Sequence, residues 1–92
     1  MSANPTRFRA SPDALATRVG DEIVLVDLRT DQIYSLNRTA TRIWELVCDD
    51  CDRAEVERRM LEEFEVSPAE LVEAIDDLIA RMTREGVLVG SA

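Results

Sequence analysis

The sequence predicts an α+β domain in which a three-stranded antiparallel β-sheet is followed by three α-helices. Three observations support this prediction. Short runs rich in β-branched residues, separated by turn signals, fill residues 15–36. From Asn37 onward the apolar residues recur at helical spacing. Two capping signals, at Asp52 and Ser67, divide this second half into three helices.

The three strands are expected to form a meander. Residues 15–19 make the first strand, and Gly20-Asp21 is a turn signal. Residues 22–28 are apolar on both alternating faces, as is typical of a central strand. Residues 29–32 then reverse the chain into residues 33–36. We therefore expect the last strand of the meander, residues 31–36, to lie at an edge of the sheet.

The first two helices follow directly. Asn37 is a good N-cap for a helix that ends near Cys48. One face of that helix collects the apolar residues Leu36, Ala40, Ile43, Trp44 and Val47. The second helix begins at Asp52, with Glu55 completing a capping box. Its inner stripe consists of Val56, Met60 and Phe64.

The third helix has the strongest boundary signals. Ser67 is the N-cap, Pro68 occupies the first helical position and Gly86 ends the helix after Glu85. Two apolar rows adjoin on it: Leu71, Ile75, Leu78 and Met82 in one, and Val72, Ile75 and Ile79 in the other. A stripe this wide is either buried against both sheet and helices, or forms one wall of a groove. Residues 87–89 are expected to pack as a short tail.

The 92 residues predict a single domain, winged-helix-like in its order of elements, with residues 1–13 flexible. No apolar run has the length of a membrane span, and the first fourteen residues lack the apolar centre of a secretory signal. Two cysteines, Cys48 and Cys51, are too few for a disulfide framework and fit a reducing compartment. We therefore expect a cytoplasmic protein.

The net charge of −8 arises in one segment. Residues 49–77 hold twelve acidic residues against three Arg, whereas residues 1–48 hold six of each. Such a field repels nucleic-acid phosphates and favours a basic peptide as partner. The alternative interpretation is a solvated face that keeps the domain soluble.

Catalysis is not expected, because the chain has no His and no Lys to transfer protons. No cofactor or metal is expected either. Cys48 and Cys51 would need two further ligands for zinc, and the chain has no other Cys and no His. Cys48 lies at a helix C-terminus, where the helix dipole disfavours a thiolate, so a packing role is the simpler interpretation.

Three binding hypotheses remain open. A winged helix often binds DNA, and Arg38 and Arg42 share one helix face, but clustered basic residues are missing. An edge strand at residues 31–36 next to an apolar helix is a template for an added peptide strand. The same edge can pair with a second copy of the chain.

From Leu15 to Val89 the chain resembles the PqqD-like family, the recognition elements of ribosomally made, modified peptides. The most specific segment is Gln32-Ile-Tyr-Ser-Leu-Asn-Arg-Thr-Ala-Thr-Arg-Ile-Trp-Glu-Leu-Val47, which is similar to the family's tyrosine strand, Leu-Asn turn and Ile-Trp-Glu-Leu helix. The family's pattern is also matched in the second helix, by Val56, Met60 and Phe64, and at the end of the third helix, by Arg84-Glu-Gly-Val-Leu88. The family's turn glycine before the third strand is Asp31 here.

This resemblance implies a non-catalytic adaptor that captures the leader segment of a precursor peptide as an added β-strand. It implies a binding strand made of Asp31, Gln32, Ile33, Tyr34, Ser35 and Leu36. It implies a helical wall made of Val72, Ile75, Asp76 and Ile79. Asp76 and Asp31 are candidate partners for a basic leader residue, and Tyr34 is equally well explained as core.

Short free-standing members resemble the small partner in lasso-peptide pathways, which hands the precursor to a separate cysteine leader peptidase and an ATP-dependent cyclase. The alternative within the family is a peptide chaperone for a radical enzyme, in another modified-peptide or quinone-cofactor pathway.

Overall fold

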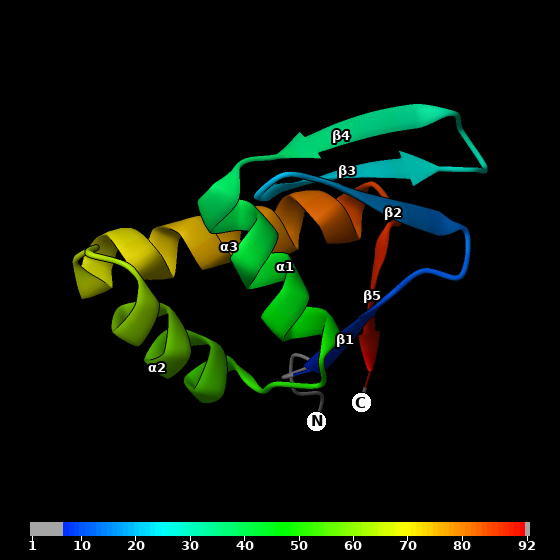
Figure 1. The fold of residues 1–92 in the computed structure, drawn as a ribbon. Coiled ribbons are helices and arrows are strands. Elements are labelled where there is room, and N and C mark those ends of the chain that lie inside the picture. The colour runs from blue at the N-terminus through cyan, green and yellow to red at the C-terminus, as the bar shows by residue number, and fades with distance from the viewer. Residues whose placement is uncertain (1–6, 92) are drawn as a thin grey trace, which may run out of the picture.

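The computed structural model describes residues 7–91 and places their helices beneath a small sheet (Figure 1). The elements are β1 (Arg7–Ala10), β2 (Ala14–Val19), β3 (Glu22–Asp27), β4 (Gln32–Leu36), α1 (Arg38–Cys48), α2 (Arg53–Glu63), α3 (Pro68–Arg84) and β5 (Leu88–Ser91). The predicted three-stranded antiparallel sheet followed by three helices is confirmed. Its strand order is β2-β3-β4, so β3 is central.

A second, two-stranded sheet was not predicted. β1 pairs antiparallel with β5, with Phe8 opposite Gly90 and Ala10 opposite Leu88. The backbone continues this pairing, because Ser11 donates its N–H to the carbonyl of Val87 at 2.9 Å. Residues 7–10, which were expected to be flexible, and residues 88 and 89, which were expected to pack as a short tail, are therefore parts of strands. Residues 1–6 lie outside the described part of the chain.

The helix boundaries follow the predicted caps. The side chain of Asn37 accepts from the backbone N–H of Ala40 at 2.8 Å, and Ser67 forms a full capping box with Glu70. Asp52 caps α2, but the Glu55 carboxylate pairs with Arg58 and Arg59 and does not complete a capping box.

The C-terminus of α3 is closed by Gly86. Val87 N–H bonds Met82 C=O and Gly86 N–H bonds Thr83 C=O, which together form a Schellman motif with Gly86 at φ +81°.

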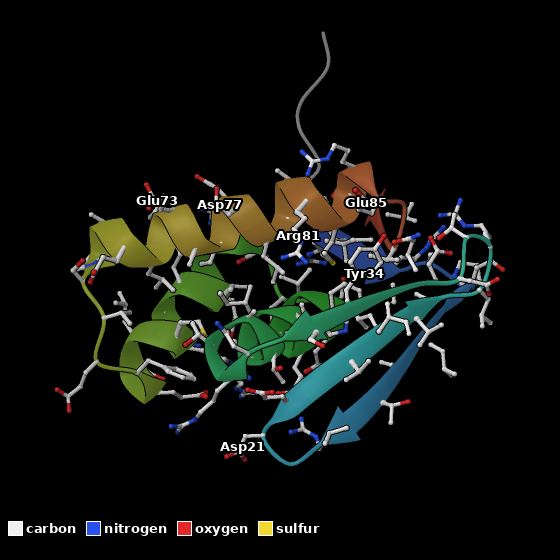
Figure 2. The ribbon with its side chains drawn as sticks, turned by 90° about the horizontal axis from the view of Figure 1, so that it is seen from above. Asp21, Tyr34, Glu73, Asp77, Arg81 and Glu85 are labelled. Atoms are coloured by element: carbon white, nitrogen blue, oxygen red, sulfur yellow. The ribbon has the colours of Figure 1, made fainter. Side chains whose placement is uncertain are left out.

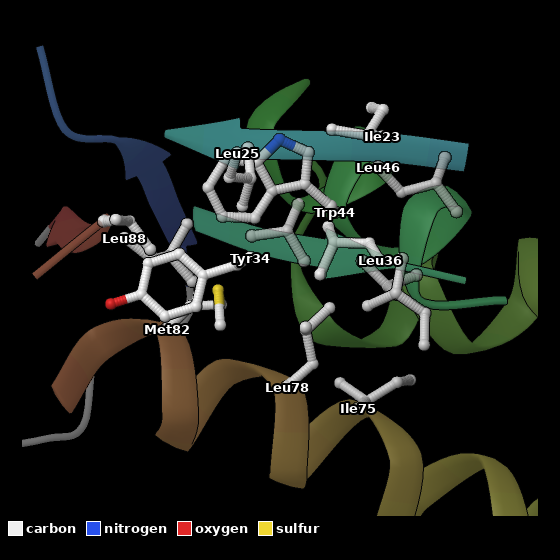
Figure 3. Close-up of a cluster of buried hydrophobic side chains, with 14 of the residues drawn as sticks. Ile23, Leu25, Tyr34, Leu36, Trp44, Leu46, Ile75, Leu78, Met82 and Leu88 are labelled. Carbon is white, nitrogen blue, oxygen red and sulfur yellow. The ribbon is translucent and has the colours of Figure 1, made fainter. Parts of the chain in front are cut away.

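The core lies between the inner face of the sheet and the helices (Figure 3). Ile23 and Leu25 of β3 and Tyr34 and Leu36 of β4 point into it and meet residues of α1 and α3. The buried row of α3 is the predicted one, Leu71, Ile75, Leu78 and Met82. Because this row is buried, α3 is fixed in its rotation and presents two different flanks on either side of the core.

A buried hydroxyl joins the sheet to α1. Thr41 Oγ1 accepts from the N–H of Ile23 at 2.9 Å and donates to the carbonyl of Leu36 at 3.0 Å. It therefore bridges the last pair of the β3–β4 ladder, at the point where the chain turns from β4 into α1.

A polar cluster at the other end of the ladder fastens the β3–β4 hairpin to α3. The carboxylate of Asp27, which is 1% exposed, accepts from the Arg29 side chain at 3.1 and 3.2 Å. Arg29 also donates to the carbonyl of Glu85 at 3.3 Å. The hydroxyl of Tyr34 donates to the Glu85 carboxylate at 3.0 Å. β4 is thereby held beside the last turn of α3.

We predict that Thr41→Val lowers the free energy of unfolding by about 1–3 kcal/mol, because it leaves a buried N–H and a buried carbonyl without a partner. Urea denaturation measures this change. Thr17→Val, at an exposed position of β2, is the matched control and should stay within about 0.5 kcal/mol of wild type. Equal effects of the two substitutions would contradict the bridging role of Thr41.

We also predict that Asp27 makes an acid-sensitive contribution to the free energy of unfolding. The hydrogen bond from Arg29 lowers the pKa of this carboxyl below its ordinary value near 4, against the opposing effect of its burial. The contribution is complete above about pH 4 and is lost as the pH falls through the lower pKa of the folded state. In urea unfolding between about pH 2.5 and 6, Asp27→Asn should show a flatter dependence on pH than wild type does. Parallel curves for the two proteins would refute this coupling.

Candidate functional site

The candidate site is built on the edge strand β4. Within residues 7–91 this strand pairs only with β3, so its other side has no partner strand. Its side chains alternate: Tyr34 and Leu36 are buried, whereas Ile33 is 67% exposed and Ser35 is exposed on the outer face. The predicted position of β4 at the edge of the sheet is confirmed.

The phase of the hydrogen-bond ladder identifies which backbone groups of β4 face the open edge. Leu28 N–H bonds Asp13 C=O at 2.9 Å, which directs alternate residues of β3, including Val24 and Val26, toward β2. The backbone N–H and C=O groups of Ile23, Leu25 and Asp27 then face β4. The Thr41 bridge between Ile23 and Leu36 agrees with this phase.

The same alternation divides the residues of β4 into two sets. Gln32, Tyr34 and Leu36 direct their backbone groups toward β3, because they are opposite Asp27, Leu25 and Ile23. Ile33 and Ser35 direct theirs away from the sheet. These two residues therefore offer two N–H donors and two carbonyl acceptors to an added strand.

One flank of α3 lies beside this edge. The guanidinium of Arg81 lies over the ring of Tyr34, 5.9 Å from its centre, and Glu85 accepts from the Tyr34 hydroxyl. Figure 2 shows Arg81 and Tyr34 directed toward each other from α3 and β4. Ala74 and Leu78 fall in the same row as Arg81 at helical spacing. The flank of α3 that lies beside β4 is therefore made by Ala74, Leu78, Arg81 and Glu85.

Tyr34 belongs chiefly to the core. It is 9% exposed, and its burial, followed by its hydrogen bond to Glu85, raises the pKa of the phenol above its ordinary value. Leu36 and Ile75 are also core residues, at 1% and 0% exposed. The part of β4 that remains available to a partner is its backbone edge, together with the side chains at the rim.

The predicted helical wall of Val72, Ile75, Asp76 and Ile79 is divided in the structure: Ile75 lies in the core, whereas the other three lie on the flank of α3 that is turned away from β4. Asp76 pairs with Arg53 of α2 at 2.8 Å, and Arg53 also donates to the carbonyl of Val72 at 3.4 Å. Asp76 therefore has an intramolecular partner in place of the expected basic leader residue. The physical reason is that the second apolar row of α3 turns toward α2 once the first row is buried.

That opposite flank lines a separate apolar cavity of about 780 Å³. Its lining residues are Phe8, Val47, Cys51, Arg53, Val56, Ile75, Asp76, Ile79, Ala80, Thr83, Arg84 and Gly90. The sequence did not reveal this cavity, because two of its walls come from the unpredicted strands β1 and β5.

Asp31 and Gln32 lie where the open edge strand, β4, begins. Asp31 adopts φ +60°, a conformation that favours glycine, so the turn keeps its shape although this chain has Asp at that position. The N–H of Gln32 is taken by Thr30 Oγ1 at 3.3 Å. Both side chains are exposed.

The cysteines give no sign of reactivity. Burial raises the pKa of the Cys48 thiol to about 11, so it stays protonated at neutral pH. Cys48 and Cys51 are both half-buried free thiols. Across residues 7–91 no three metal-ligating side chains come together, and no helix is long and apolar enough to cross a membrane.

Comparison with solved structures finds two close matches in fold. TbiB1 in complex with the TbiA(beta) leader peptide has a TM-score of 0.82 and 23% sequence identity, over 91% of this chain and 98% of that one. Lasso peptide synthetase B1 complexed with the leader peptide has a TM-score of 0.81 and 25% identity, over 90% of this chain and 98% of the other. No curated protein sequence matches significantly.

The family comparison covers most of the described fold. The family model for coenzyme PQQ synthesis protein D (PqqD) matches residues 22–88, which include the whole β3–β4 hairpin and all three helices. The chain therefore belongs to the PqqD family.

Proposed function

We propose that this protein is a leader-peptide-binding adaptor, which takes up the leader segment of a ribosomal precursor peptide as a fourth strand next to β4. The observation that carries the proposal is the open edge, where the backbone groups of Ile33 and Ser35 face outward beside the flank of α3 that carries Leu78 and Arg81. The two solved structures described above both contain a bound leader peptide, which supports the same role.

The register of the added strand follows from the geometry of β4. In antiparallel pairing, a leader residue opposite Tyr34 or Leu36 places its side chain on the inner face, against the Ala74–Arg81 flank of α3. A residue opposite Ile33 or Ser35 places its side chain on the outer face. A leucine-sized anchor buried against that flank contributes about 1.5–3 kcal/mol, and each backbone hydrogen bond about 0.5–1.5 kcal/mol.

The adaptor works by presentation and without catalysis of its own. The absence of His and Lys from the sequence and the protonated Cys48 support this part of the proposal. We place the protein in the cytoplasm, in a lasso-peptide pathway. There it would hand the bound precursor to a separate cysteine leader peptidase and then to an ATP-dependent cyclase.

An exposed apolar row on the outer face of the sheet supports a contact between the adaptor and such a modifying enzyme. Leu15, Val26 and Ile33 are cross-strand neighbours on the outer face of the sheet, and Leu15 and Ile33 are 54% and 67% exposed. A leader strand added beside Ile33 would extend this row, so that one apolar surface would combine adaptor and leader.

Blocking the open edge should prevent binding. Ser35→Pro removes an outward N–H and places a ring at the edge, while the bonds between β4 and β3 remain. We expect at least about a tenfold loss of affinity, or about 1.4 kcal/mol, in calorimetric titration with the leader of the precursor encoded beside this gene. Ala16→Pro, at an outward-facing position of the other edge strand, β2, is the matched control and should bind as wild type does. If both variants are folded and bind equally well, strand addition at β4 is wrong.

A second pair of substitutions tests whether the leader binds at the open edge of β4 or in the cavity on the other flank of α3. Ala74→Glu introduces bulk and charge beside β4 and should weaken leader binding by at least about tenfold. Ala80→Glu makes the same change at the cavity and should leave the affinity unchanged. The reverse pattern in fluorescence anisotropy, with thermal unfolding confirming that both variants are folded, would locate the peptide in the cavity.

A further inference from the structure

Arg81 differs from most arginines of this chain in its lack of an ionic partner. Eight of the eleven arginines pair with a carboxylate within residues 7–91. The three without such a pair in that range are Arg9, Arg38 and Arg81. Arg38 lies over the ring of Phe64, whereas Arg81 lies over the ring of Tyr34, beside the open edge of β4.

The unpaired state of Arg81 is informative because suitable carboxylates are near. Asp77 is four residues earlier on the same helix, a spacing that commonly gives an ion pair. Figure 2 shows Asp77 and Glu73 on the side of α3 away from the sheet, while Arg81 turns toward Tyr34. The Glu85 carboxylate is engaged by the Tyr34 hydroxyl at 3.0 Å. Stacking on Tyr34 therefore holds an exposed guanidinium at the strand edge, with its hydrogen-bond donors available.

We propose that Arg81 binds a carboxylate side chain, Asp or Glu, at the leader residue opposite Tyr34. This inference rests on the proposed function, because it assumes that the leader is the strand added to β4. A residue opposite Tyr34 directs its side chain to the same face of the sheet, where the guanidinium lies. Guanidinium and carboxylate form paired, charge-assisted hydrogen bonds, which specify position as well as charge.

Glu85 makes this contact sensitive to the register of the leader. Glu85 lies one turn beyond Arg81 on the same flank of α3, and its carboxylate disfavours a leader carboxylate beside it. A leader carboxylate is therefore favoured beside Arg81 and disfavoured beside Glu85.

The test combines variants of both partners. The probe is the leader peptide of the precursor encoded beside this gene, with each Asp or Glu replaced in turn by its amide. We expect Arg81→Glu to weaken binding of the unmodified leader by roughly tenfold and Arg81→Lys to weaken it less. Arg84→Glu makes the same change of charge one turn later on the other flank and should leave the affinity unchanged.

Three results decide the matter. If a single amide replacement weakens binding to wild type but not to Arg81→Gln, and salt reduces this difference, the carboxylate contact is established. If Ser35→Pro abolishes binding while Arg81→Glu binds as wild type does, the leader occupies the edge without Arg81, and only this inference is overturned. If Ser35→Pro and Arg81→Glu both bind as wild type does, the proposed function and this inference are both overturned.

Discussion

The period-two alternation of a single strand, β4, determines both the core and the open edge. Tyr34 and Leu36 are buried against α3 and α1, which fixes the face of the strand. With the face fixed, the backbone groups of Ile33 and Ser35 must point away from β3. A shift of one residue in the register would expose Tyr34 and Leu36 and bury Ile33, so the core itself holds the binding edge in phase. Thr41 fixes the end of the ladder, because its hydroxyl takes up the last pair of backbone groups.

The polar cluster around Arg29 determines how close β4 lies to α3. Arg29 connects the buried carboxylate of Asp27 with the carbonyl of Glu85, and a Cβ at residue 86 would lie 2.3 Å from Nη2 of Arg29. Gly86 therefore serves two purposes, since it ends α3 at positive φ and leaves room for the guanidinium. The edge of the sheet and the helix flank are positioned by this cluster and not by loop length alone.

Local signals allowed most of the fold to be predicted. Asn37 and Ser67 cap their helices through their own side chains, and turn residues separate the three strands of the meander, so each signal lies within a few residues of the element it defines. The pairing of β1 with β5 has no such signal, because it joins opposite ends of the chain. The width of the apolar stripe on α3 also left open which of its flanks faces β4. That choice depends on how the helix crosses the sheet, which is why Asp76 and Ile79 were assigned to the wrong side.

The distribution of charge shows a similar difference between global and local information. The net charge of −8 favoured a basic partner, but much of the acidic segment is already paired within the molecule, as in Arg53 with Glu57 and Asp76, and Arg42 with Glu63. The electrostatic environment of a ligand at the open edge of β4 is therefore determined by the nearby charged side chains that have no ionic partner. Specificity is a difference between two free energies, so a carboxylate such as that of Glu85, which disfavours a wrong register, contributes to it together with an attractive contact in the right one. An overall acidic domain with one exposed cation beside its open strand is thus suited to position an extended peptide, and not only to retain it.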